Sequence, residues 1–119
     1  MLTPEEWVRQ HMVRYLIDVK GFPISLISLE YRLSISGTSK RSDIVLFNHD
    51  AKPIVIVECK APSVAITQDT FDQANVYNIA LKVTHIIITN GLVHYCCTIN
   101  PVARTLHFLN EIPNFKDIR

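Results

Sequence analysis

The sequence predicts an α/β fold in which a mixed β-sheet lies between helices. Two patterns carry this prediction. Apolar residues recur with a helical period near the N-terminus and again over about 67–82, whereas the segments between and after them have the β-branched or alternating composition of strands. The resulting order, α-β-β-β-α-β-β, places an antiparallel meander first and a helical crossover to a further strand second. A length of 119 residues suits a single domain over 1–119.

The segment LTPEEWVRQHMVRYLIDVKGFP predicts the first helix. Thr3 is expected to cap its N-terminus, with Pro4 at the first helical position and Glu6 completing a capping box. Gly21 and Pro23 predict its end. A stripe of apolar residues at helical spacing is expected to face the core: Val8, Met12, Tyr15, Leu16 and Val19.

Three strands are predicted next. LISLEYRLSI alternates, with Leu29 and Tyr31 on one face and Glu30 on the other, which is typical of a half-buried strand. SGTSKRS is expected to be a loop. DIVLF and IVIVECK, separated by the turn NHDAKP, are almost continuously apolar, which favours central strands covered on both faces.

The second half of the chain begins with the helix predicted over 67–82, which carries Asp69 in its first turn. VTHIIIT predicts a buried strand, and Asn90-Gly91 predicts a two-residue hairpin turn into the strand LVHYCCT. Asn100-Pro101 is expected to end that strand. TLHFL predicts one more short strand, and residues 110–119 are expected to form a tail.

Composition excludes several classes of protein. The net charge of +1 argues against coating nucleic acid by bulk electrostatics, although Lys40 and Arg41 could contribute to a local DNA-binding patch, or equally to a solvated loop. No apolar run reaches the ~18 residues of a membrane helix, and MLTPEEW has no export signal, so a cytoplasmic protein with no membrane partner is expected. Three cysteines, two of them adjacent, do not make a disulfide framework.

The strongest chemical signal is the end of IVIVECKAP. Side chains alternate along a strand, so Glu58 and Lys60 share a face while the carbonyl of Cys59 remains available between them. If NHDAKP closes a hairpin, Asp43 lies opposite them. Two carboxylates and a carbonyl suit Mg²⁺, with Mn²⁺ expected to substitute, and a lysine beside them suits phosphodiester hydrolysis. The simpler alternative is an ion pair between Glu58 and Lys60.

RSDIVLF…KPIVIVECKAP resembles the Asp…Glu-x-Lys signature of the PD-(D/E)xK nuclease superfamily, with Ser42 in the position of the motif's proline. The element order resembles the restriction-endonuclease-like α-β-β-β-α-β core of that superfamily. LTPEEWVRQHMVRYLI, ECKAPSVAITQDTFDQANVYNIALKVTHIIITNGLVHYC and FLNEIPNF resemble the nuclease domain at the N-terminus of type I restriction enzyme R subunits. This resemblance covers nearly the whole chain.

The resemblance implies roles for residues at matching positions. Asp43 and Glu58 would bind Mg²⁺ and Lys60 would be the catalytic lysine. QANVY resembles a Q-x-x-x-Y motif, in which Gln73 would orient water or a phosphate and Tyr77 would contact the DNA backbone. A polar helix surface with Tyr77 as core filler is the alternative.

Glu6, or alternatively Glu5, would correspond to an acid that reaches the metal or its water from the first helix in many members of the superfamily. A capping role explains this residue as well.

The expected function is therefore a Mg²⁺-dependent DNA endonuclease domain linked to restriction. The 119 residues contain no P-loop, so ATP-driven translocation is not assigned to them. DNA, a second copy in a homodimer and restriction-modification subunits are the expected partners. The alternative is a non-catalytic DNA-binding or assembly module that retains the fold. A zinc site formed by His85, His94 and Cys96 is a further alternative to ordinary strand residues.

Overall fold

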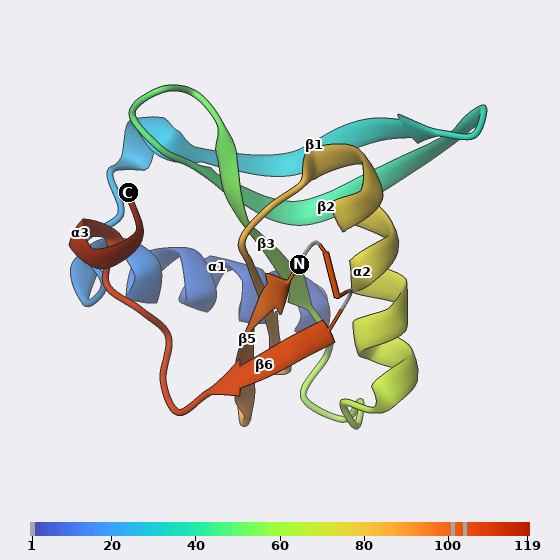
Figure 1. Ribbon diagram of the computed structural model, residues 1–119. Helices are drawn as coiled ribbons and strands as arrows, with labels where there is room; N and C mark the ends of the chain where they lie inside the picture. The colour runs from blue at the N-terminus through green and yellow to red at the C-terminus, as the bar shows by residue number, and fades with distance from the viewer. Residues whose placement is uncertain (1, 101, 104) are drawn as a thin grey trace.

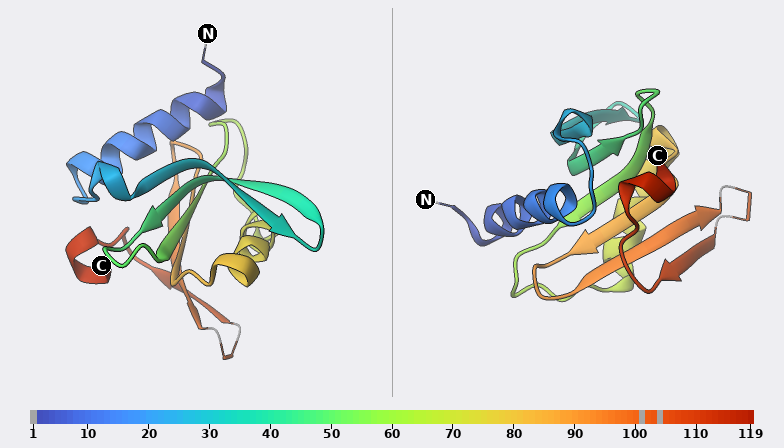
Figure 2. Two further views of the ribbon diagram at one scale, coloured as in Figure 1. Left: turned by 90° about the horizontal axis from the view of Figure 1, so that it is seen from above. Right: turned by 90° about the vertical axis from the view of Figure 1, so that its left-hand side faces the viewer.

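A central sheet between two helices organises the molecule. The structure, a computed structural model, describes residues 2–100, 102–103 and 105–119; within α2 (Gln68–Leu81) the side chains of 77–80, and in β1 that of Ile35, lie outside the description. Helices α1 (Pro4–Asp18) and α2 cover opposite faces of the sheet (Figures 1 and 2). The predicted α/β class with a mixed sheet flanked by helices is confirmed.

The six strands of the described sheet follow one another in sequence order, from β1 to β6. They are β1 (Ile27–Ile35), β2 (Thr38–Phe47), β3 (Pro53–Cys59), β4 (His85–Thr89), β5 (His94–Asn100) and β6 (Thr105–Leu109). All neighbours are antiparallel except β3 and β4, which are parallel and joined through α2. A parallel pair needs such a crossover, as the sequence pattern predicted.

Thr3 caps helix α1 as predicted, because its hydroxyl accepts a hydrogen bond from the amide of Glu6 at 3.1 Å. The carboxylate of Glu6 bonds Arg9 instead of completing the predicted capping box. Its residues Val8, Met12 and Leu16 are buried against the sheet. Val19, predicted to belong to the same stripe, is 60% exposed because the helix has already ended at Asp18. None of the described helices is both long and apolar enough to cross a membrane.

Two cores fill the spaces between the layers. Val55, Val57 and Ile87 pack toward α1, whereas Ile56, Ile86 and Ile88 pack with Phe71 and Ala74 of α2. Both faces of β3 and β4 are therefore buried, which explains the continuous apolar runs in their sequences.

The predicted loop 36–42 is wrong. β2 already begins at Thr38, so β1 and β2 form one long hairpin whose connection is Ser36-Gly37. Both residues have positive φ, 50° and 77°, as two-residue hairpin turns with right-handed strand twist require. Lys40 and Arg41 consequently lie on a strand, paired with Leu33 and Arg32.

Two further expectations need correction. Asn90-Gly91 is part of a four-residue loop between β4 and β5, because the side chain of Asn90 accepts hydrogen bonds from the amides of Leu92 and Val93, each at 2.9 Å. Residues 110–119 are more than a tail: they contain a short helix, α3 (Phe115–Ile118), and bury Ile112 and Phe115 in the core beneath α1. Isolated apolar residues separated by Pro and Asn give no periodic signal.

Candidate active site

Two carboxylates meet where the central strands separate. The pairing of β2 with β3 ends at Ile44 and Val57. Just beyond this pair, Oδ2 of Asp43 accepts the amide of Cys59 at 2.8 Å, and the carboxyl groups of Asp43 and Glu58 lie within hydrogen-bonding reach of each other. The structure therefore brings together the two acids that the predicted hairpin placed opposite one another.

The environment of Glu58 makes its charged form costly. Burial, and then the neighbouring carboxyl of Asp43, raise the pKa of Glu58 to about 8. The hydroxyl of Ser42, which is fully buried, donates to Oε1 of Glu58 at 3.2 Å and acts in the opposite direction, as does the positive charge of Lys60. Sequence reasoning gave Ser42 no role, although it directly precedes Asp43.

Lys60 and Gln73 share a pocket with Glu58. The pocket has a volume of about 310 Å³ and lies between the end of β3, the strand β2 and the helix α2. Lys40 and the buried Thr70 also line it. No ion pair within 4.0 Å joins Glu58 to Lys60 in the described structure, so the simple salt-bridge alternative is not what the geometry shows. Tyr77 lies outside the residues whose side chains are described.

A second pocket of about 320 Å³ opens on the other side of Asp43 and is lined by the first turns of α1. Glu6 lies there, and its carboxylate pairs with Arg9 at 2.6 Å. Arg9 also bonds Glu30 of β1 at 2.9 Å, and Arg41 lies 3.8 Å from the same Glu30 carboxylate. The i, i+3 spacing of Glu6 and Arg9 could have predicted the first contact, but the contact with Glu30 depends on the fold.

The donor atoms at the acid pair suit a hard cation. The amide of Cys59 points toward Asp43, whereas the next amide, that of Lys60, points the other way and bonds the carbonyl of Thr89 in β4 at 2.8 Å. In a strand, the carbonyl of a residue points to the same side as its own amide, so the carbonyl of Cys59 also points toward the side of Asp43. Two carboxylates and a carbonyl form an all-oxygen set of the kind that Mg²⁺ accepts. The raised pKa of Glu58 gives the same indication, because a divalent cation would relieve the repulsion between the acids.

The zinc alternative is wrong. Among the described residues, no three His, Cys, Asp or Glu side chains are placed to hold a metal together. His85 pairs with Thr98 and His94 pairs with Thr89, so the two histidines lie at opposite ends of the β4–β5 ladder. Four residues along a strand correspond to roughly 13 Å, which is too far for one zinc ion.

The fold and the acid pair define a class, that of restriction-endonuclease-like domains. Solved structures share this fold. A fragment from Vibrio vulnificus YJ016, described as an HsdR subunit of a type I restriction enzyme, matches with a TM-score of 0.68 and 20% identity over 98% of this chain and 24% of that one. A protein from Anabaena variabilis ATCC 29413, described as a nuclease belonging to DUF820, matches with a TM-score of 0.60 and 12% identity over 98% of this chain and 76% of that one.

The type IIG restriction endonuclease BpuSI matches with a TM-score of 0.52 and 20% identity, over 96% of this chain and 14% of that one. No curated protein sequence matches the chain. A family model described as type I restriction enzyme R protein N terminus (HSDR_N) matches residues 4–113. The chain belongs to this family. It spans about a quarter of the length of the Vibrio fragment.

Proposed function

We propose that this protein is a Mg²⁺-dependent DNA endonuclease domain of the PD-(D/E)xK type. The observation that carries the proposal is the half-buried Asp43–Glu58 acid pair, which lies where the pairing of β2 with β3 ends, with Lys60 lining the same pocket as Glu58. A protein gains no stability from forcing two carboxylates together, so an arrangement of this kind calls for a cation. Membership of the restriction R-subunit family supports DNA as the substrate.

Each residue has a distinct task in this proposal. Asp43, Glu58 and the carbonyl of Cys59 would hold Mg²⁺. The ion, when bound, supplies Lewis acidity and lowers the pKa of coordinated water. Lys60 offers an ammonium group to stabilise charge on the phosphate or to hold the attacking water. Gln73, which is exposed on α2 and lines the same pocket, orients that water or a phosphate oxygen.

Ser42 and the amide of Cys59 act through the acids. The Ser42 hydroxyl fixes one oxygen of Glu58, and the Cys59 amide fixes one oxygen of Asp43. Both carboxylates are thus positioned before a ligand arrives, which limits the reorganisation needed for catalysis. Glu6 borders Asp43 from α1, where its bond to Arg9 holds it beside the pocket.

The partners follow from the family. We propose that the domain works with restriction-modification subunits, including an ATP-driven translocase. Cleavage of both strands of a duplex would require a second active site, and a second copy of this chain is one source of that site.

The test is cleavage of supercoiled and linear DNA by the purified protein with Mg²⁺ or Mn²⁺. We expect nicking or cutting that is abolished by EDTA and reduced at least ~100-fold by Lys60→Ala, as expected when a group that stabilises transition-state charge is removed. Lys116→Ala, at an exposed residue of α3, is the matched control and should cut like the wild type.

Cleavage that survives Lys60→Ala would contradict the proposal. If the protein binds DNA but never cuts it, with or without restriction-modification subunits, and binds no Mg²⁺, the alternative of a non-catalytic DNA-binding module would replace it.

A further inference from the structure

The β1–β2 hairpin continues beyond the sheet as a two-stranded arm. β2 pairs with β3 only as far as Ile44, whereas its pairing with β1 continues out to Thr38 and Ile35. We call residues 31–42 the arm. It projects past α2, as Figures 1 and 2 show. The sequence predicted a strand for residues 31–35 but a loop for 36–42, so the predicted site does not account for a two-stranded ribbon in this place.

The arm begins at the acid pair. The β1–β2 ladder pairs Leu29 with Ile44 and Tyr31 with Ser42, but the intervening pair, Glu30 and Asp43, is missing from it. Glu30 has a φ of 53°, a left-handed conformation that is unfavourable for a residue other than glycine. Asp43 therefore lies at the junction between sheet and arm, so the direction of the arm is coupled to the position of a proposed metal ligand.

The arm concentrates positive charge. It carries Arg32, Lys40 and Arg41 and contains no acid, which gives it a charge of +3 in a chain whose net charge is +1. Its remaining exposed residues are rich in hydroxyl groups. Of the five that the structure describes, four carry a hydroxyl, namely Ser34, Ser36, Thr38 and Ser39, and the fifth is Gly37. Arginine, lysine and small hydroxyl side chains are the groups that most often contact DNA phosphates.

Two of these charges face each other. Arg32 and Arg41 are direct partners across the antiparallel ladder, and both are exposed. Like charges in this arrangement destabilise a hairpin. Glu30 lies 3.8 Å from Arg41, but it also pairs with Arg9, so one carboxylate serves several guanidinium groups. A polyanion alongside this pair would be attracted by both guanidinium groups.

We propose that the arm enters the major groove of duplex DNA and holds the duplex over the acid pair. This inference rests on the proposed function and adds the form of the substrate and the way it is held. The major groove, about 12 Å wide, admits a two-stranded ribbon as it stands, whereas the minor groove, about 6 Å wide, takes one only if the duplex is widened or bent. Five residues per strand, from 31 to 35 and from 38 to 42, give the arm a reach of roughly 17 Å.

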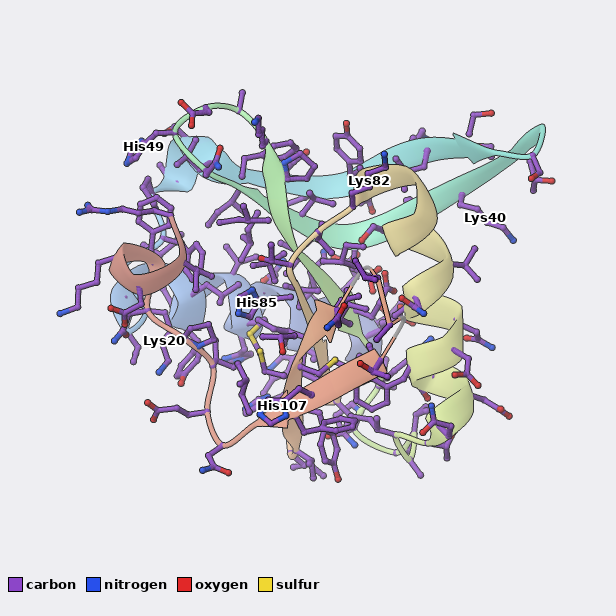
Figure 3. All side chains as sticks on the ribbon, in the orientation of Figure 1. Lys20, Lys40, His49, Lys82, His85 and His107 are labelled. Atoms are coloured by element: carbon purple, nitrogen blue, oxygen red, sulfur yellow. The ribbon has the colours of Figure 1, made fainter. Side chains whose placement is uncertain are left out.

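Lys40 connects the arm to the catalytic pocket. It lies on the outer part of β2, projecting beside α2 (Figure 3), and lines the pocket that contains Glu58 and Lys60. A phosphate held by Lys40 would therefore stand at the entrance of that pocket. The other two cations of the arm, Arg32 and Arg41, form the neighbouring pair one step nearer the sheet, and the hydroxyl-rich residues beyond Lys40 form the tip that enters the groove.

The test measures binding separately from cutting. A fluorescent 20-base-pair duplex and the corresponding single strand are titrated with the Lys60→Ala protein in EDTA, at several salt concentrations. Arg32→Ala with Lys40→Ala is the arm variant, which leaves the Arg41–Glu30 contact in place. Lys52→Ala with Lys116→Ala is the control, because it removes the same charge from two exposed lysines outside the arm.

We expect the arm variant to bind the duplex more weakly and to lower the slope of log K against log salt by about 2, one for each lost phosphate contact. The control should leave the slope unchanged. A shortened arm, made by deleting residues 34, 35, 38 and 39, keeps the turn and the register of the remaining pairs, and should abolish the protection of guanine N7 in the major groove from methylation.

The inference would be overturned if the arm variant and the control weakened duplex binding equally. It would also be overturned if only the binding of the single strand were weakened, or if the protein with the shortened arm bound the duplex like the wild type. Circular dichroism verifies that each variant is folded. The experiments distinguish a failure of the nuclease proposal from a failure of the arm proposal. Binding that depends on the arm without any Mg²⁺-dependent cutting refutes the nuclease, whereas Lys60-dependent cutting by a protein with a shortened arm refutes the arm.

Discussion

Replacing Glu58 with glutamine should stabilise the metal-free protein at neutral pH, although it should abolish catalysis. The pKa of Glu58 is about 8 in the folded protein and near 4.5 when the chain is unfolded. The folded state therefore binds the proton more tightly, and its stability falls as pH rises from 4.5 toward 8. Between pH 4.5 and pH 7 this single group removes on the order of 3 kcal/mol of folding free energy, and glutamine avoids that loss.

The assay is urea unfolding in EDTA at pH 5, 6, 7 and 8. The difference in unfolding free energy between Glu58→Gln and the wild type should grow with pH, in favour of the variant. Glu111→Gln, at an exposed acid of the C-terminal segment, is the control and should show no such trend. Parallel pH profiles for the wild type and Glu58→Gln would refute the reasoning, because they would mean that the acid pair carries no electrostatic cost.

Mg²⁺ provides a second readout of the same prediction. A ligand that binds only the folded state stabilises it by mass action. Mg²⁺ should therefore raise the stability of the wild type at pH 7 to 8 and have much less effect on Glu58→Gln, which lacks one of the two carboxylates. An equal response of both proteins would place the ion elsewhere.

Two further predictions concern the core. Phe115→Ala should cost about 3 to 5 kcal/mol of unfolding free energy, since this residue of α3 is only 6% exposed, whereas Lys116→Ala should change stability by less than about 0.5 kcal/mol; equal effects would mean that the C-terminal segment is not part of the core. Gly91→Ala should be more destabilising than Gly21→Ala. Both glycines have positive φ, which costs an alanine roughly 1 to 2 kcal/mol, but only at Gly91 would the new Cβ also meet Cγ2 of Val8, at 3.1 Å. Thermal unfolding compares the two variants, and equal losses would contradict this reasoning.

Local patterns were sufficient for helices α1 and α2, for the central strands and for the centre of the site. The buried strands β3 and β4 have unbroken apolar runs because both faces are covered, and α1 has a cap that is encoded in consecutive residues. The meeting of Asp43 with Glu58 was also predictable, because a hairpin places the start of one strand beside the end of the next. The four-residue loop at Asn90 was not, since its side-chain bonds compete with the hairpin turn that the same dipeptide favours.

By itself, the sequence determined the order of the elements, the mixed sheet and the strand end that carries Glu58 and Lys60, because periodicity and strand alternation are local properties. Only the tertiary structure decided which distant groups surround the acids. The bond from Ser42 to Glu58 spans 16 positions, and that from Arg9 to Glu30 spans 21. The same holds for the second strand of the arm, since the polar composition of residues 36–42 is that of a loop. It forms a strand because the two-residue turn at Ser36-Gly37 brings it into register with β1. Residues 38–41 are exposed on both faces, so their sequence has no alternating apolar pattern from which a strand could be predicted.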